Sequence, residues 1–277
     1  METDNGLVTT GGEGQEVATL ASMLAQDAAD VAATEKGSTF PTLSIRDKKF
    51  AIDGLELPNP KQTTVIILQA AFENAYYEEG FDPDSPAPPD CYAVGYDEAT
   101  LAPPEDLETK QHDTCAGCPK NEWGSAEKGK GKACKNQRKL ALISADAIND
   151  GPGGVAKSTV VVLRIPPTST GPYSKYVKRL ANLLKLPPYA VSTTLSFDEG
   201  ESYALLKFKE AARLADPAAP DSVLLMQAII ALRDSIRTPL VQVVTFTKRE
   251  AEDDGEKKPE DKGKSDQKER IKRKIGA

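Results

Sequence analysis

The chain has 277 residues and a formal net charge of -7, because 42 Asp and Glu residues outnumber 35 Lys and Arg residues. Hydrophobic residues make up 39% of it and charged residues 28%, which is typical of a soluble globular protein that carries some disordered sequence. The acidic balance argues against a uniformly basic nucleic-acid coat and against a protein that binds anionic membranes. No run approaches about 18 consecutive apolar residues, and the N-terminus lacks the basic and apolar regions of a signal peptide. We therefore expect a cytoplasmic protein that has no contact with a membrane.

The two ends of the chain differ in composition from its middle. Residues 1–38 are rich in Ala, Gly, Thr and acidic residues, which predicts a flexible acidic segment. Within it, apolar side chains recur at about helical spacing between Glu16 and Ala33, which predicts one weak helix. Residues 248–277 are almost wholly charged residues and glycine, cannot bury a core, and are predicted to form a disordered tail. Residues 39–247 remain as the core domain.

The core domain is predicted to be mainly β with helices (α+β). Short runs of β-branched and aromatic residues, separated by turn-forming residues, predict strands over residues 42–45, 50–52, 63–77, 139–144, 158–165, 190–197, 203–208 and 241–246. Apolar side chains at helical spacing predict helices over 173–186 and about 221–237. Short strands joined mostly by turns, with a helix between them, favour an antiparallel barrel like the oligonucleotide-binding fold (OB-fold).

An insert of about residues 91–134 holds all the cysteines of the chain: Cys91, Cys115, Cys118 and Cys134. A C-x2-C pair followed about 15 residues later by a third cysteine is a zinc-ribbon spacing, and four thiolates form a closed structural site. Without a secretory signal, one metal site is favoured over two disulfides. We therefore predict one structural Zn²⁺ in a four-cysteine site. Buried free thiols and a redox-active C-x2-C pair are the alternatives. His112 is a candidate substitute ligand, although an exposed loop histidine is the simpler interpretation.

Charge is segregated around this insert. Residues 72–113 hold twelve acids and one base, whereas residues 114–139 hold seven bases and two acids, together with the only tryptophan. Basic side chains interleaved with an aromatic ring are typical of a groove for single-stranded nucleic acid, because cations contact phosphates and rings stack on bases. The candidate contacts here are Lys120, Trp123, Lys128, Lys130, Lys132, Lys135, Arg138 and Lys139. The alternative is a solvated lysine loop with Trp123 buried against the cysteines.

A second cluster of basic and aromatic residues lies on the predicted helix over residues 173–186. Tyr173, Tyr176 and Lys178 are its candidate nucleic-acid contacts. Tyrosines at such positions more often belong to the core than to a surface on which bases stack.

Residues 151–159 approach a phosphate-binding loop, G-x4-G-K-[ST], with Ala156 in place of the second glycine. That loop functions by following a strand and opening a helix. Here a β-branched run follows and ends at Pro166, so we predict a hairpin loop. No catalytic set of residues emerges elsewhere, and we expect no enzyme.

A resemblance adds to this interpretation. The strings Cys115-Ala-Gly-Cys118-Pro-Lys-Asn-Glu-Trp123-Gly-Ser and Gly129-Lys-Gly-Lys-Ala-Cys134-Lys-Asn-Gln-Arg138 resemble a cysteine motif of bacteriophage proteins from replication gene neighbourhoods. More loosely, residues 60–210 resemble the bacteriophage zinc-containing single-stranded DNA-binding proteins, in which a zinc subdomain is inserted into an OB-fold. The resemblance implies that the four cysteines are zinc ligands. It also implies that Trp123, the lysines of 128–135 and Arg138 border a DNA groove.

The resemblance further implies sequence-nonspecific binding of single-stranded DNA during phage DNA replication or recombination, in the cytoplasm of the host cell. Proteins of this family usually end in an acidic tail that recruits partners. Here residues 250–261 are acidic, but residues 262–277 carry seven bases and two acids. Replication or recombination proteins are therefore candidate partners of the charged tail, and the tail itself is also a candidate for DNA contact.

The leading hypothesis is a non-catalytic, zinc-stabilised single-stranded DNA-binding protein with an OB-like core. The alternative is a structural or protein-interaction component, in which zinc stiffens a docking loop and nucleic acid is not bound. A third hypothesis is an enzyme that uses the loop of residues 151–158.

Overall fold

The computed structural model describes Met23, Leu24, Asp27 and residues 40–80, 88–127, 129–215 and 219–242. The chain divides into two compact units, Met1–Val244 and Thr245–Ala277, and all described residues belong to the first. The predicted disordered tail and Lys128 lie outside the described residues. Of the predicted N-terminal helix, three residues are described, and all three are helical.

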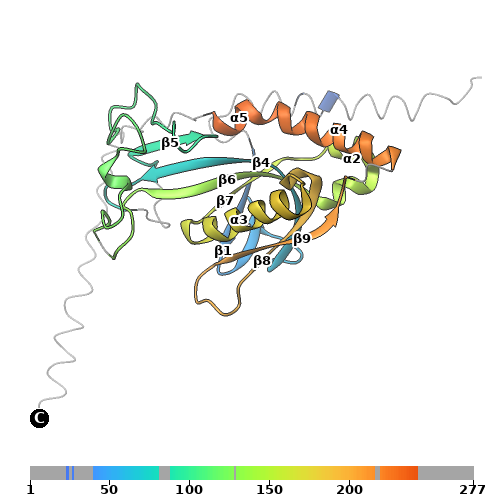
Figure 1. Cartoon of the computed structure of the whole chain (residues 1–277), viewed down its shortest axis with the longest axis horizontal. Helices are drawn as coiled ribbons and strands as arrows, with labels where there is room; N and C mark the ends of the chain where they lie inside the picture. Colours follow the sequence, from blue (N-terminus) through green and yellow to red (C-terminus); the bar gives the residue numbers. More distant parts are fainter. Residues whose placement is uncertain are drawn as a thin grey trace, which may run out of the picture. The chain divides into compact units, whose positions relative to one another are not determined.

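The described strands form one nine-stranded sheet (Figure 1). They are β1 (Thr42–Arg46), β2 (Lys49–Ile52), β3 (Leu55–Glu56), β4 (Gln62–Tyr76), β5 (Cys91–Gly95), β6 (Lys135–Ser144), β7 (Val161–Ile165), β8 (Val191–Phe197) and β9 (Leu206–Arg213). Their order is β3-β2-β1-β7-β6-β4-β8-β9, and β5 pairs with the far end of β4. The β1–β7 pair is parallel, and the other described pairs are antiparallel.

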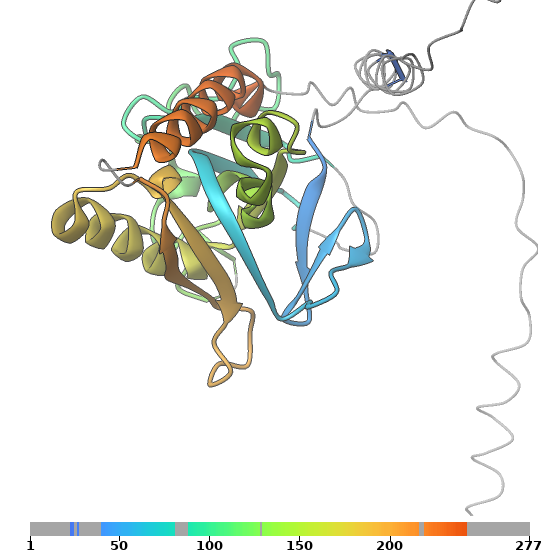
Figure 2. The same cartoon turned by 90° about the vertical axis from the view of Figure 1, so that its right-hand side faces the viewer.

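The sheet is curled and open, like half of a barrel (Figure 2). This confirms the predicted mixed α+β character and is compatible with an OB-like fold. Barrel closure is not seen among the described strands, because β3 and β9 remain edges of the sheet. Side chains bring the two ends together instead, since the rings of Phe50 on β2 and Phe197 on β8 lie 4.6 Å apart.

Helices cover both faces of the sheet. They are α2 (Gly151–Ala156), α3 (Pro167–Arg179), which continues as a π-helical turn (Leu180–Leu184), α4 (Pro220–Ser235) and α5 (Arg237–Val241), with 3-10 helices at Pro119–Asn121, Ala145–Asp150 and Pro188–Ala190. Because side chains alternate along a strand, Leu140 and Leu142 of β6 join the core under α3, whereas Ala141 and Ile143 join the core under α4 and α5.

Each predicted strand except the last coincides with an observed strand, although several boundaries shift. The predicted strand over 241–246 is wrong at its start, because Val241 ends α5; residues 243–246 lie outside the described part. The sequence does not predict strand β5, since five residues with two aromatic or β-branched side chains give little period-2 signal.

The predicted hairpin loop at residues 151–158 is also wrong, because Gly151–Ala156 forms helix α2. Gly154 allows this helix to pack closely, since a Cβ there would lie 2.3 Å from the Ala147 carbonyl oxygen. Val155 is thereby buried in the core. Lys157 follows the helix rather than opening it, so its position does not match that of the phosphate-binding lysine.

In the described part of the chain, no helix combines the length and the apolar character needed to cross a membrane.

One ammonium group links the two ends of the curled sheet. Lys48, in the β1–β2 turn, donates to the carbonyl oxygens of Asp198 (3.1 Å) and Glu201 (2.5 Å) in the β8–β9 loop. We predict that Lys48→Met lowers the free energy of unfolding by about 2 kcal/mol, because both carbonyls lose a charged donor. Urea unfolding would measure this change. The control Lys61→Met removes an exposed 3.8 Å ion pair with Glu199 in the same region, and should cost less than about 0.5 kcal/mol. Equal effects of the two substitutions would contradict the prediction.

Candidate functional site

The insert is built on the outer half of the long strand β4. There β4 pairs with β6 on one side and, over residues 72–76, with β5 on the other. Strand alternation places Phe72, Asn74 and Tyr76 on one face, and the register sets Arg138 and Asn136 beside the first two of them. The site is therefore a continuation of the sheet face that carries the core under α3.

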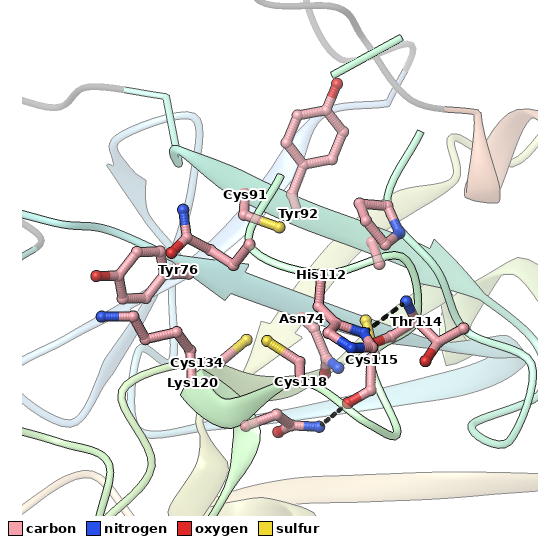
Figure 3. A pocket seen from close by; sticks show the side chains of 14 residues that line it. Asn74, Tyr76, Cys91, Tyr92, His112, Thr114, Cys115, Cys118, Lys120 and Cys134 are labelled. Atoms are coloured by element: carbon pink, nitrogen blue, oxygen red, sulfur yellow. Dashed lines mark hydrogen bonds between the residues drawn. The ribbon is translucent and has the colours of Figure 1, made fainter. Parts of the chain in front are cut away.

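The four cysteines line one small pocket on this face (Figure 3). Cys91 opens β5, Cys115 and Cys118 form the turn before the 3-10 helix Pro119–Asn121, and Cys134 immediately precedes β6. The cavity between them has a volume of about 20 Å³, which is about the space of one water-sized sphere. The four residues that sequence spacing assigned to a metal site are thus brought together from three segments.

Backbone hydrogen bonds hold these segments in register. Cys115 N–H donates to the Leu101 carbonyl (2.8 Å), and Cys134 N–H donates to the Lys120 carbonyl (2.9 Å). The Asn121 side-chain amide donates to the Cys115 carbonyl (2.8 Å). The turn that carries the C-x2-C pair is therefore fixed to both neighbouring segments.

Burial and, to a smaller extent, the other three cysteines raise the pKa of the Cys134 thiol to about 12. Burial also raises the pKa values of Cys91 and Cys115. Such thiols stay neutral at neutral pH unless a cation compensates the thiolate charge. Within the described residues, no three His, Cys, Asp or Glu side chains are arranged as a metal ion requires. The pocket thus gathers four sulfur donors without converging them on one point.

His112 lines the same pocket, and its ring also contacts the loop that carries it. Its Nδ1 atom lies 3.2 Å from the Thr114 amide nitrogen and 3.0 Å from the Thr114 carbonyl oxygen. The ring also packs on Gly117, where an added Cβ would lie 3.2 Å from His112 Cε1. These contacts support the C-x2-C turn.

Six of the predicted nucleic-acid contacts lie on or beside the insert: Lys120, Trp123, Lys130, Lys132, Lys135 and Arg138. The Trp123 side chain is 81% exposed, and the Lys132 ammonium lies 6.0 Å from the centre of its ring. Trp123 is therefore not buried against the cysteines. No carboxylate of the described residues lies within ion-pair distance of the four lysines.

Two of these cations stack on aromatic rings of β4. The Arg138 guanidinium lies 3.1 Å from the centre of the Phe72 ring, and the Lys120 ammonium lies 5.0 Å from the centre of the Tyr76 ring. Burial lowers the pKa of Arg138, although Glu98 acts in the opposite direction. A positive charge is thus held against each ring along one face of the strand.

Three other predicted contacts are buried. Lys139 is 7% exposed, and its ammonium donates to the Leu240 carbonyl (2.7 Å). Strand alternation places Lys139 on the face of the sheet opposite to Arg138. Tyr173 and Tyr176 belong to the core under α3, where the Tyr176 hydroxyl bonds Thr193 Oγ1 (2.7 Å). Lys178 is exposed on α3. The structure therefore leaves Lys139 and the two tyrosines unavailable for stacking or phosphate contact.

Sequence reasoning missed a group of cations from the C-terminal helices. The Arg237 guanidinium lies 5.2 Å from the centre of the Tyr96 ring, and the Arg233 guanidinium lies 4.7 Å from the centre of the Tyr189 ring. The i, i+4 spacing of the two arginines was the only local signal, and it does not show which rings they meet.

Fold and site together define a curled mixed sheet with a cysteine-lined pocket under a basic, tryptophan-bearing loop. Comparisons of this chain with models of protein families, with curated proteins and with solved structures give no match.

Asn74 anchors the pocket to the sheet. It is 7% exposed, its Oδ1 accepts from the Asn136 side-chain amide (2.7 Å), and it hydrogen-bonds Cys115. We predict that Asn74→Ala lowers the free energy of unfolding by about 1–3 kcal/mol, because buried polar partners lose their bonds. Chemical denaturation would measure this, with the exposed Asn59→Ala as a control that should stay within about 0.5 kcal/mol. A stability change for Asn74→Ala no larger than that of the control would contradict the anchoring role.

Proposed function

We propose that the protein binds single-stranded DNA without sequence specificity, through the basic face of a zinc-stabilised insert on an OB-like core. The observation that carries this proposal is the exposed Trp123 ring, which stands beside lysines that have no carboxylate at ion-pair distance in the described residues. Stacking on a ring and neutralisation of phosphates are the two contributions on which nonspecific strand binding depends. The resemblance to phage zinc-containing single-stranded DNA-binding proteins supports the same function and a role in replication or recombination.

The geometry of the loop supports a surface role for the tryptophan. The amides of Gly124 and Ala126 both donate to the Gly131 carbonyl (2.9 and 3.2 Å), which closes the loop on itself. Ser125 Oγ accepts from the Ala133 amide (2.9 Å) and donates to the Lys120 carbonyl (2.9 Å). These bonds stabilise a loop that presents a large ring to solvent, where burial would otherwise have been favourable.

The proposed cofactor is one Zn²⁺ bound by Cys91, Cys115, Cys118 and Cys134. All four thiols line one pocket of the size of a single small ligand, and no carboxylate lines it. Sulfur donors suit Zn²⁺, and a site of four thiolates leaves no position open for catalysis. Its contribution would be structural: it would join the C-x2-C turn to β5 and to the start of β6.

We predict about one zinc ion per chain in protein purified without chelator. Cys118→Ser should reduce the zinc content to well below one ion and lower the melting temperature, because one of four ligands is lost. Elemental analysis and thermal unfolding measure the two effects. His112→Ala is the matched control, and it should keep the zinc content of the native chain. A metal-free native protein, or equal loss in the control, would overturn the assignment of the four cysteines as ligands.

Trp123 gives a direct test of DNA binding. We predict that oligo(dT) quenches its fluorescence, and that Trp123→Ala weakens binding about tenfold or more, because a stacked base is lost. Tyr203→Ala is the control, since Tyr203 is an exposed aromatic residue in the β8–β9 loop, and it should leave the affinity unchanged. Fluorescence anisotropy of a labelled oligonucleotide measures both variants.

Raising the salt concentration should weaken this binding steeply, with a linear dependence of log affinity on log salt. Unchanged fluorescence together with no gel shift at low salt would exclude the proposal. A stable complex with another protein would then favour the structural or interaction component.

A further inference from the structure

Part of the backbone edge of β4 has no strand partner among the described residues. On the side away from β6, residues 62–66 pair with β8 and residues 72–76 pair with β5. Residues 67–71 have no ladder partner there, because the chain before β8 turns into the 3-10 helix Pro188–Ala190. The register irregularity between Ile67 and Gln69 falls in the same stretch. We call this gap the β4 notch.

The β4 notch is a cavity lined by two arginines. It has a volume of about 350 Å³, and Gln69, Ala70, Tyr173, Tyr189, Arg233 and Arg237 are among the residues that line it. No acidic residue is part of this lining. Arg233 pairs with Asp234 at 2.7 Å, whereas no carboxylate of the described residues lies within ion-pair distance of Arg237.

Aromatic rings hold both arginines in place. Arg233 lies over Tyr189, and Arg237 lies over Tyr96, whose hydroxyl donates to the Arg237 carbonyl oxygen (2.5 Å). Gln69 also hydrogen-bonds Tyr96, which joins this ring to the unpaired edge of β4. A guanidinium that lies over a ring still presents its edge to an anion. Arg233 already donates from Nε and Nη2 to Asp234 Oδ1 (3.0 and 2.7 Å), so Arg237 is the less engaged of the two arginines.

The notch, a middle hollow and the cysteine pocket follow one another along β4. A second hollow of about 680 Å³ is lined by Phe72 and Asn74 and reaches Tyr96, and the cysteine pocket follows at Asn74 and Tyr76. Asp97 and Glu98 also line this middle hollow, so phosphates would be bound at the cationic ends and not at its acidic wall. Arg138 lies with Phe72 and Lys120 lies with Tyr76 along β4, and Arg237 lies with Tyr96 directly after the neighbouring strand β5.

Cations that alternate with aromatic rings suit the binding of a single-stranded nucleic acid. Guanidinium groups bind phosphate oxygens through paired N–H donors, and aromatic or guanidinium planes stack on unpaired bases. The described part of this chain has five cation–ring pairs, all in or beside the insert and the β4 notch.

We propose that the β4 notch is a second binding site for the same single-stranded DNA, in which Arg233 and Arg237 contact phosphates and Tyr189 contacts a base. This inference rests on the proposed function, and it extends the binding path from the insert to the C-terminal helices. A strand long enough to span both places engages them together, whereas a very short strand engages the insert alone.

The test compares a short oligo(dT) of about 5 nucleotides with one of about 20, which brackets known site sizes. The double variant Arg233→Gln/Arg237→Gln should weaken binding of the long probe about tenfold, reduce its salt dependence, and leave the short probe unchanged. The charge-matched control Arg46→Gln/Arg213→Gln removes two exposed arginines from β1 and β9, and should change neither affinity by more than about twofold.

The outcomes separate this inference from the proposed function. A native protein that binds neither probe contradicts both. A native protein that binds both probes, with the double variant equal to the control, overturns the notch alone. If the double variant unfolds, the variant Arg233→Lys/Arg237→Lys replaces it. This variant keeps the positive charge but lacks the planar guanidinium group. It should therefore lose less affinity than the glutamine variant, and only for the long probe. Full native affinity of that variant would overturn a guanidinium-specific site.

Discussion

Strand β4 is the constraint on which the rest of the structure depends. Its 15 residues pair with β6 along one side and with β8 and then β5 along the other, so a single extended segment belongs to both the core sheet and the insert. Its residues 65–68 are buried on both faces, between the core under α3 and the core under α4 and α5. Its second half keeps the same pleat, but the partners of Phe72, Asn74 and Tyr76 are now polar or cationic. The transition from the core to the candidate binding surface therefore takes place along one strand.

The insert is positioned by backbone hydrogen bonds and by the pleat of this strand, and much less by a hydrophobic core of its own. Its apolar cluster consists of Ala93, Leu101 and Cys115, with Phe72 beside it. So small a cluster buries little apolar area, which is the usual reason for a small subdomain to use a bound metal. The four cysteines come from three separate segments, and in the proposed zinc site they would join these segments.

Local sequence was sufficient to predict most strands and the cysteine set. Runs of β-branched and aromatic residues identified β4, β6 and β8, and the C-x2-C spacing selected residues that do share one pocket. Positions that depend on tertiary packing could not be predicted. Lys139 follows Arg138 in a basic run, yet the pleat buries one and leaves the other on the candidate surface. The notch arginines meet rings that lie far away in sequence, and no local pattern indicates those contacts.

The parallel contact between β1 and β7 has a consequence for the order of folding. Thr42 pairs with Val162, so the N-terminal hairpin of β1 and β2 cannot join the sheet until β7 has formed. Strands β6 and β7 are themselves separated by a short helical segment and can pair early, as local contacts do. The chain between β1 and β7 is a long loop, and closing it costs chain entropy before the contacts between these two strands compensate that cost. The first strand of the chain is therefore expected to dock late, and this step would limit the rate at which the curled sheet forms.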